Sequence, residues 1–192
     1  MRPLVVGVAG SARRGGNSDR LLAAALEGAR AAGAGTELLI PAELEFSHCL
    51  ACERCRGTGC CVLRDGAEAA YRLLLSCQGL VVATPVYFRG LPAPFKALVD
   101  RAQFLYFRRY QLRDPNLPQG RPALLVLVAA GEGKGQFELL KRQLAPWLST
   151  LGFVPRGVLA VGGADRPGEL PSRALARARG LGRELLRLNE NT

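Results

Sequence analysis

Short, uninterrupted apolar runs alternate along the chain with longer segments in which apolar residues recur every three or four positions. The short runs have the length and composition of strands that are buried on both faces. The longer segments have one apolar face each, which is typical of helices that pack against a sheet. The predicted strands cover residues 4–9, 37–40, 79–83, 123–129 and 157–161. The predicted helices cover residues 17–32, 66–75, 92 or 94 to 104, 136–151 and 171–188.

The alternation of strand and helix predicts a parallel sheet covered on both faces by helices. Five strands and five helices favour an α/β, flavodoxin-like three-layer sandwich with strand order 2-1-3-4-5 over the six-stranded dinucleotide-binding fold. We expect one domain over residues 1–192, because this length suffices for one buried core and is short for two. Asn17 or Ser18 is expected to cap the first helix. Residues 106–120 form an irregular stretch, expected to be a lid, a subunit contact or a surface excursion.

Composition and charge narrow the class of protein. Lys and Arg number 26 against 16 Asp and Glu, giving a net charge of +10, and the arginines are scattered through every segment. The positive electrostatic field of such a protein would attract phosphate-bearing ligands or an acidic partner, although an arginine-rich composition bias explains the excess charge slightly better. No apolar run approaches the roughly 20 residues that cross a bilayer, and a first strand explains the apolar start of the chain better than a secretion signal. We therefore expect a cytoplasmic protein without a membrane segment.

Five of the six cysteines crowd into the loop at residues 48–65. In a reducing compartment such a cluster indicates metal or redox chemistry rather than structural disulfides. Three thiols at short, equal spacing with a fourth nearby can surround one 4Fe-4S cluster, whereas zinc, free or switching thiols and a motif without metal are the alternatives. Cys77 is expected to be a packing residue, and His48 a surface neighbour of the first thiol. The candidate ligands are Cys49, Cys52, Cys55 and either Cys60 or Cys61.

Three loops follow the first, third and fourth predicted strands, at the edge of the sheet where such folds bind ligands. Loop 10–18 precedes a helix and carries hydroxyl, amide and guanidinium donors, so it suits a phosphate monoester. It has neither a P-loop nor a dinucleotide fingerprint. Loop 84–92 offers Tyr87 and Phe88 as a wall for a flat heteroaromatic ring, and the glycines of loop 130–136 let the backbone approach that ring. Plain turns without a ligand are the alternative for each loop.

Three segments carry a resemblance to a known family: GSARRGGNS at residues 10–18, CCVLRD at 60–65 and ATPVYFRGLPAPFKALVDR at 83–101. Together they are similar to the NADPH-dependent FMN reductase family, and in particular to its iron-sulfur flavoprotein branch. The resemblance implies a flavodoxin-like fold, FMN as cofactor and assembly into homodimers or homotetramers. It also implies Cys61 as the fourth cluster ligand, with Cys60 as the alternative.

The same resemblance implies roles for the residues of the three loops. Those implied to hold the FMN phosphate are Ser11, Arg13, Asn17 and Ser18. Those implied to lie along the isoalloxazine ring are Thr84, Pro85, Val86, Tyr87 and Phe88, with Gly131 on its far side. Lys96, Asp100 and Arg101 match the family's helix, although the spacing of Lys96 and Asp100 also fits a surface ion pair.

The sequence thus predicts an FMN-dependent oxidoreductase that passes electrons between FMN, a 4Fe-4S cluster and an external carrier, which would be NAD(P)H, ferredoxin or a quinone. No side-chain acid or base is needed, in agreement with a sequence that contains one histidine. One alternative is a cluster-free NAD(P)H-dependent FMN or quinone reductase whose cysteines are structural or bind zinc. Another is a basic nucleic-acid or redox-sensing binding module, which the low aromatic content disfavours.

Overall fold

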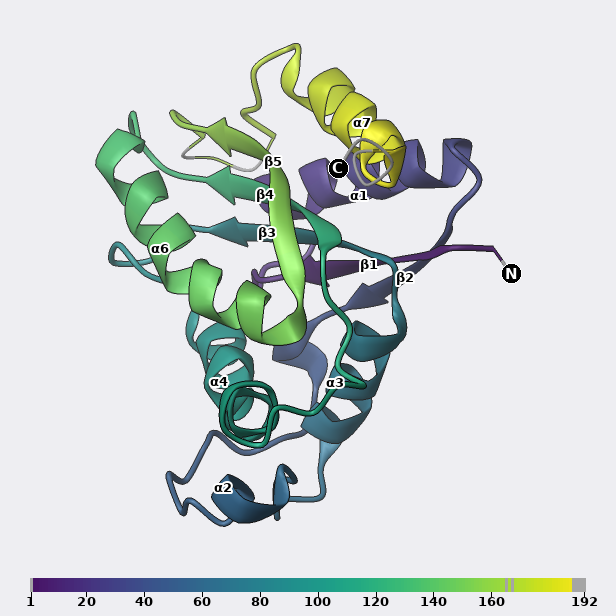
Figure 1. Cartoon of the computed structure of the whole chain (residues 1–192). Coiled ribbons are helices and arrows are strands. Elements are labelled where there is room, and N and C mark those ends of the chain that lie inside the picture. Colours follow the sequence, from purple (N-terminus) through teal and green to yellow (C-terminus); the bar gives the residue numbers. More distant parts are fainter. Residues whose placement is uncertain (1, 165, 167, 188–192) are drawn as a thin grey trace.

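The computed structural model describes residues 2–164, 166 and 168–187, and a five-stranded parallel sheet lies at its centre (Figure 1). The strands are β1 (Leu4–Ala9), β2 (Gly35–Leu39), β3 (Gly79–Pro85), β4 (Arg121–Val128) and β5 (Phe153–Val161). Their order is β2-β1-β3-β4-β5, which confirms the predicted flavodoxin-like topology. Because neighbouring strands are parallel, their carboxyl ends meet at one edge of the sheet.

Central and edge strands differ in how well the apolar pattern predicts their ends. All eight residues of β4 are buried, since helices cover both faces of the strand, and the apolar run predicted at 123–129 lies within two residues of its observed ends, Arg121 and Val128. The edge strand β5 begins at Phe153, so the predicted start at residue 157 is wrong. Residues 154–156 are exposed and interrupt the apolar run, yet the backbone of β5 pairs with β4 along this whole length.

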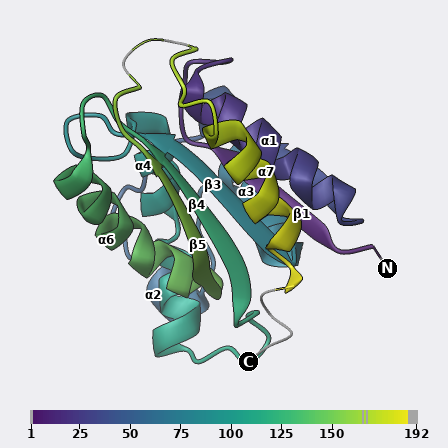
Figure 2. The ribbon, with the colours of Figure 1, turned by 90° about the horizontal axis from the view of Figure 1, so that it is seen from above.

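Helices cover the sheet in two layers (Figures 1 and 2). The helices are α1 (Asn17–Ala31), α2 (Cys55–Thr58), α3 (Gly66–Ser76), α4 (Ala93–Arg101), α5 (Gln103–Tyr106), α6 (Lys134–Leu151) and α7 (Ala174–Glu184), with short turns η1 (Pro41–Glu43) and η2 (Phe107–Gln111). α1 and α7 lie on one face of the sheet, and α3, α4 and α6 lie on the other. Each layer encloses its own apolar core. The end of the last helix, predicted at residue 188, lies outside the described residues.

The stretch 106–120 is helical as far as Gln111, so the prediction of an irregular segment is wrong for its first part. Apolar residues continue at helical spacing through Leu98, Ala102 and Leu105, and all three are buried. α5 and the π-helical turn η2 therefore prolong the direction of α4 along the core. The prediction missed this continuation because the two arginines and the tyrosine of η2 are polar or amphipathic.

α1 and α7 pack so closely that backbone touches backbone (Figure 2). A Cβ atom at Gly28 would lie 1.9 Å from the carbonyl oxygen of Arg179, and one at Gly182 would lie 1.9 Å from the carbonyl oxygen of Ala25. Neither position can therefore hold a side chain without separating the helices. This contact fixes α7, and with it the loop that precedes it, against the start of α1.

We expect Gly28→Ala to destabilise the protein by about 1–3 kcal/mol, because overpacking at the α1–α7 contact outweighs the better helix propensity of alanine. Gly180→Ala is the matched control: it lies on α7, and a Cβ atom there would meet nothing within 4 Å. This control should stabilise the protein by up to about 1 kcal/mol. Urea unfolding measures both values. Equal effects of the two substitutions would contradict the close packing.

Candidate functional site

A cavity of about 150 Å³ lies at the carboxyl ends of the strands, against the N-terminus of α1. We call it the strand-edge cavity. It is lined by Ser11, Arg13, Gly16, Asn17, Ser18, Pro85, Val86, Tyr87, Val128, Ala129, Ala130, Ala164 and Arg166. Loops after β1, β3, β4 and β5 thus contribute to one cavity. The sequence prediction considered only the first three of these loops.

The loop after β1 is folded for anion binding at the start of α1. The amide of Gly10 donates to the carbonyl of Ala83 at 2.7 Å, which holds the loop beside β3. The Ser11 hydroxyl accepts a hydrogen bond from the amide of Arg13 at 3.0 Å and so turns the chain toward the helix. The first amides of α1 have no partner within the helix, and the helix dipole makes this end attractive to a phosphate. Ser18 is buried here, and Arg13 is exposed at the mouth.

Asn17 ties the loop after β5 to the start of α1. Its side-chain amide donates to the carbonyl of Arg166 at 2.8 Å and accepts from the amide of Gly168 at 2.9 Å. The side chain is thereby directed away from the helix amides, and α1 has Gly16 as its N-cap residue without a side-chain cap bond. The prediction that Asn17 or Ser18 caps the helix is therefore wrong. Asn17 instead closes one wall of the strand-edge cavity.

The loop after β3 divides its residues between the cavity, the core and the solvent. Pro85, Val86 and Tyr87 line the cavity. Thr84 is fully buried beneath it, and its hydroxyl donates to the carbonyl of Pro85 at 3.0 Å. Phe88 is fully exposed at the tip of a tight turn, with a positive φ of 48°. The residues predicted along the ring are thus brought together only in part within this structure.

Gly131 lies beside the strand-edge cavity but not among its lining residues. Its φ of 57° is a left-handed conformation that favours glycine, and its carbonyl accepts a hydrogen bond from the amide of Gly163. This bond joins the loop after β4 to the loop after β5. Ala164 and Arg166, which the sequence prediction missed, reach the cavity through that second loop. In the sequence, only the position of this loop could have indicated these two residues, since the loop also follows the carboxyl end of a strand.

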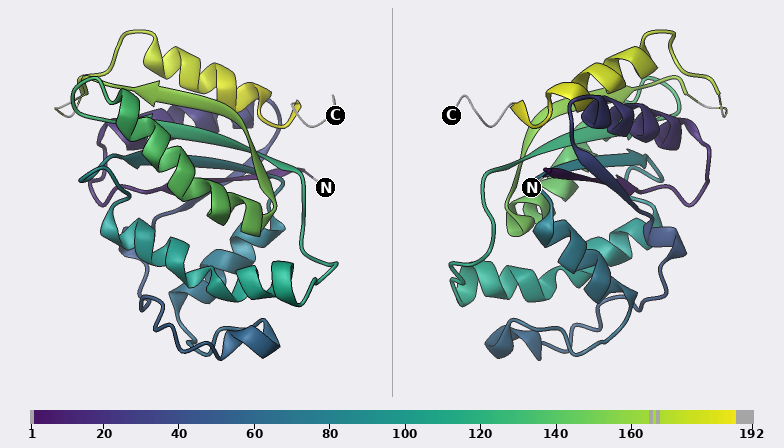
Figure 3. Two further views of the ribbon diagram at one scale, coloured as in Figure 1. Left: turned by 60° about the vertical axis from the view of Figure 1, so that its left-hand side comes forward. Right: turned by 90° about the vertical axis from the view of Figure 1, so that its right-hand side faces the viewer.

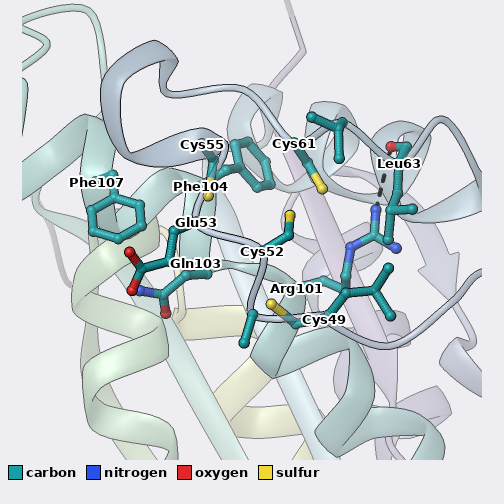
Figure 4. Close-up of a pocket in the computed structure, with 13 residues that line it drawn as sticks. Cys49, Cys52, Glu53, Cys55, Cys61, Leu63, Arg101, Gln103, Phe104 and Phe107 are labelled. Atoms are coloured by element: carbon teal, nitrogen blue, oxygen red, sulfur yellow. Dashed lines mark hydrogen bonds between the residues drawn. The ribbon is translucent and has the colours of Figure 1, made fainter.

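A second cavity, of about 300 Å³, lies within the cysteine-rich loop, which projects below α4 and α5 (Figure 3). We call it the cysteine cavity. Its walls include four thiols of the loop together with side chains at the end of α4, in α5 and in η2 (Figure 4). The four thiols belong to Cys49, Cys52, Cys55 and Cys61. Cys60 is exposed and lines a neighbouring cavity of about 180 Å³ instead.

The four thiols of the cysteine cavity act on one another electrostatically. Burial raises the pKa of the Cys55 thiol, and the charges of Cys61, Cys49 and Cys52 raise it further. Bound metal would relieve this repulsion, because coordination favours the thiolate form of each ligand. Within the described residues, no group of three His, Cys, Asp or Glu side chains is arranged to hold a single metal ion. The suitability of this site for a cluster therefore rests on two features: the four thiols are the donors that a cluster needs, and they line one cavity.

The backbone around Cys52 is held in a strained conformation. Ala51 and Glu53, the residues on either side, have φ values of 50° and 54°, where residues other than glycine are uncommon. Strain of this kind persists only where surrounding structure imposes it. The two stems of the cysteine-rich loop, residues 45–47 and 63–66, are joined by a hydrogen bond from the amide of Gly66 to the carbonyl of Glu45 at 3.0 Å.

The structure also places four further residues that were singled out in the sequence. Cys77 is fully buried in the core, as predicted, and His48 is exposed. Lys96 and Asp100 form an exposed ion pair at 2.6 Å on α4, which confirms the simpler of their two interpretations. In the part of the chain that the structure describes, no helix is both long and apolar enough to span a membrane.

Comparison with known proteins places this architecture in a family. Residues 3–165 match the NADPH-dependent FMN reductase family. An iron-sulfur flavoprotein of Archaeoglobus fulgidus is 31% identical over 182 residues, covering 94% of this chain and 77% of that protein. An iron-sulfur flavoprotein of Methanosarcina thermophila is 34% identical over 110 residues, covering 57% of this chain and 58% of that protein. The chain thus matches little more than half the length of this second relative.

A solved structure is similar in fold. The NAD(P)H:quinone oxidoreductase from Methanothermobacter marburgensis has a TM-score of 0.72 at 22% identity, with 96% of each chain covered. Taken with the family match, the strand order and the two cavities, these likenesses identify the chain as a member of the NADPH-dependent FMN reductase family, in its iron-sulfur flavoprotein branch.

Proposed function

We propose that this protein is an FMN-dependent oxidoreductase that passes electrons between FMN in the strand-edge cavity, a 4Fe-4S cluster in the cysteine cavity and an external carrier. The observation that carries the proposal is the presence of both cavities in one chain, each with the donor chemistry that its group requires. The family match supports FMN, and the names of the curated relatives support the cluster.

The strand-edge cavity would hold the phosphate end of FMN. Its volume of about 150 Å³ is below the roughly 300 Å³ at which cavities begin to enclose a drug-sized ligand, so the ring would extend along the rim. Ser11, Ser18 and the first amides of α1 would donate to the phosphate, and Arg13 would add a charge-assisted bond. Tyr87 would stand against the ring from the loop after β3.

Bound in this place, FMN would supply exchange between paired and single electrons. The chain's own task is to position the ring and to exclude water from it. Pro85, the last residue of the buried strand β3, and Val86, which follows it directly, provide an apolar floor. The backbone amide of Val86 is already used, donating to the carbonyl of Val128 at 2.8 Å, so the floor is rigid. No side chain has to act as an acid or base.

The cysteine cavity would hold the cluster through Cys49, Cys52, Cys55 and Cys61. A cluster in this place would supply single-electron transfer. The cavity walls are mainly apolar and include Phe104 and Phe107, and such surroundings limit the access of water to the sulfur ligands other than Cys52, which is exposed. NAD(P)H, a ferredoxin or a quinone would serve as the external carrier. To identify the donor, the protein is mixed anaerobically with NADPH, NADH or reduced ferredoxin, and the absorbance of the flavin shows which of them reduces it.

We expect Arg13→Ala to weaken FMN binding about 10- to 100-fold, because a charge-assisted hydrogen bond contributes about 1.5–3 kcal/mol. Riboflavin, which lacks the phosphate, should bind equally to the wild type and the variant. Arg14→Ala is the matched control, since Arg14 pairs with Asp19 at 3.0 Å and does not line the cavity. Titration of flavin fluorescence measures all affinities. Equal losses for FMN and riboflavin would contradict a phosphate site at Arg13.

A further inference from the structure

Two arginines in the described part of the chain are buried, and one of them lies at the cysteine cavity. Arg101, in the last turn of α4, is 3% exposed and lines the cavity with the four thiols. The other, Arg121, lies on β4 and hydrogen bonds to backbone carbonyls of the core, including those of Leu74 and Cys77. A buried guanidinium requires charged or polar partners, and those of Arg101 belong to the cysteine-rich loop.

Arg101 joins the two stems of that loop. Its Nη1 donates to the carbonyl of Ser47 at 2.7 Å, before the first thiol, and to Oδ2 of Asp65 at 2.7 Å, after the last. Its Nη2 donates to Oδ1 of Asp65 at 3.0 Å and approaches the carbonyl of Leu63 at 3.5 Å. One guanidinium thus contacts both ends of the loop that carries the five clustered cysteines.

Asp65 extends the same network. One of its oxygens accepts the amide of Ser47 at 3.1 Å, and the other accepts the amide of Ala67 at 3.1 Å, which caps α3. Burial opposes the charged form of Asp65, yet the hydrogen bonds from Arg101, Ser47 and Ala67 lower its pKa below the usual value. The pair therefore stays ionised at neutral pH and holds the loop between α3 and α4.

The guanidinium also lies beside a thiol of the cavity (Figure 4). Burial would lower the pKa of Arg101, but the hydrogen bonds to Asp65 and the nearby Cys61 raise it. The Nε atom of Arg101 is buried without a hydrogen-bond partner among the described residues. A buried N–H donor without an acceptor is uncommon in folded proteins, and sulfur of a thiolate or a cluster is an acceptor of the right kind.

We propose that Arg101 is a positioning residue of the cysteine site: it clamps the stems of the loop, and its positive charge beside Cys61 raises the reduction potential of the cluster. The second part rests on the proposed function, whereas the clamp does not. A cation close to the sulfur ligands favours the reduced, more negative state of a cluster. Asp65 offsets this charge in part and fixes its position.

The test compares Arg101→Gln and Arg101→Lys with Arg121→Gln, a control that removes the other buried arginine, whose hydrogen bonds go to Leu74, Leu75, Cys77 and Leu151 rather than to the loop. Amide hydrogen exchange of residues 45–66 reports the clamp, and redox titration followed by electron paramagnetic resonance reports the potential of the cluster. In Arg101→Gln, exchange in this loop should accelerate at least about tenfold relative to the rest of the protein, and the potential should fall. In Arg101→Lys the potential should return toward the wild-type value while the loop stays poorly protected. The control should change neither the relative exchange of the loop nor the potential.

Wild-type exchange rates in Arg101→Gln would overturn the clamp, and an unchanged potential would overturn the role of the charge. If the wild-type protein binds FMN but no iron, the cluster part of the proposed function fails, and the role of the charge fails with it. Hydrogen exchange of the same iron-free protein then decides the clamp by itself, so the two failures remain distinguishable.

Discussion

Cys61→Ser is expected to abolish the iron-sulfur cluster, whereas Cys60→Ser is expected to leave it in place. The two thiols are adjacent in sequence, yet only Cys61 lines the cavity shared by Cys49, Cys52 and Cys55. Cys60 is exposed and lines a neighbouring cavity, not the one shared by the other three thiols. A serine hydroxyl is a poor substitute for the thiolate that iron in such clusters requires.

Iron and acid-labile sulfide, assayed after anaerobic purification, measure the effect of both substitutions. In Cys61→Ser we expect iron and the broad visible absorbance that dithionite bleaches to fall to background. The FMN content should stay at the wild-type level in both variants, because the strand-edge cavity is built from other loops. Loss of iron in Cys60→Ser together with its retention in Cys61→Ser would exchange the assignments of the two thiols. It would contradict the choice of Cys61 as the ligand on the basis of the cysteine cavity.

Arg121→Met is expected to lower the free energy of unfolding by about 3 kcal/mol or more. The substitution leaves buried carbonyl groups without a hydrogen-bond donor, and each such group costs about 1–3 kcal/mol. Nη1 of Arg121 donates to the carbonyls of Leu74, Leu75 and Cys77 at 3.0, 3.1 and 2.6 Å, and Nη2 donates to that of Leu151. The ends of α3 and α6 therefore meet at one cation. Methionine is similar in length but provides no donor.

The charge of Arg121 persists despite its surroundings. Burial lowers its pKa to about 10, which still leaves the guanidinium protonated at neutral pH. The central guanidinium carbon of Arg121, Cζ, also lies 4.0 Å from the centre of the Phe153 ring, and the substitution removes this cation–π contact. Urea unfolding gives the free energy. Arg72→Met, on the exposed side of α3 and paired with Glu68, is the control and should change stability by less than about 1 kcal/mol. Similar effects of the two substitutions would contradict the role of Arg121 at the ends of α3 and α6.

The fold was predictable wherever burial on both faces made the sequence pattern continuous. β1 has the predicted ends, because its apolar residues form an unbroken run between polar loops. β5 and η2 show where this reasoning fails. Residues 154–156 are exposed yet belong to β5, and the helical turn η2 contains two arginines, a tyrosine and a glutamine in place of an apolar stripe. In both segments the backbone conformation is determined by tertiary contacts that lie far away in the sequence.

The candidate site was predictable as a set of loops and only in part as a set of side chains. Tyr87 and Ser11 line the strand-edge cavity as expected, whereas Phe88 is exposed to solvent and Thr84 is buried beneath the floor. A run of five consecutive residues does not reveal which of its members turn inward, because this depends on the tight turn that follows.

The role of Arg101 could not be read from the sequence, since its partner Asp65 lies 36 positions away. The residues between them include α3 and β3, and only the fold brings the two ends of this segment together. In the sequence alone, Arg101 is one of many scattered arginines. Its burial and its position at the stems of the loop distinguish it from the rest.

The content of iron, acid-labile sulfide and FMN in anaerobically purified protein tests most directly whether one chain holds both groups. We predict about four iron atoms, about four sulfides and about one FMN per chain, with a dithionite-bleachable absorbance superimposed on the flavin bands. Protein that retains neither flavin nor iron when both are supplied, or that contains zinc in place of iron, would contradict this prediction.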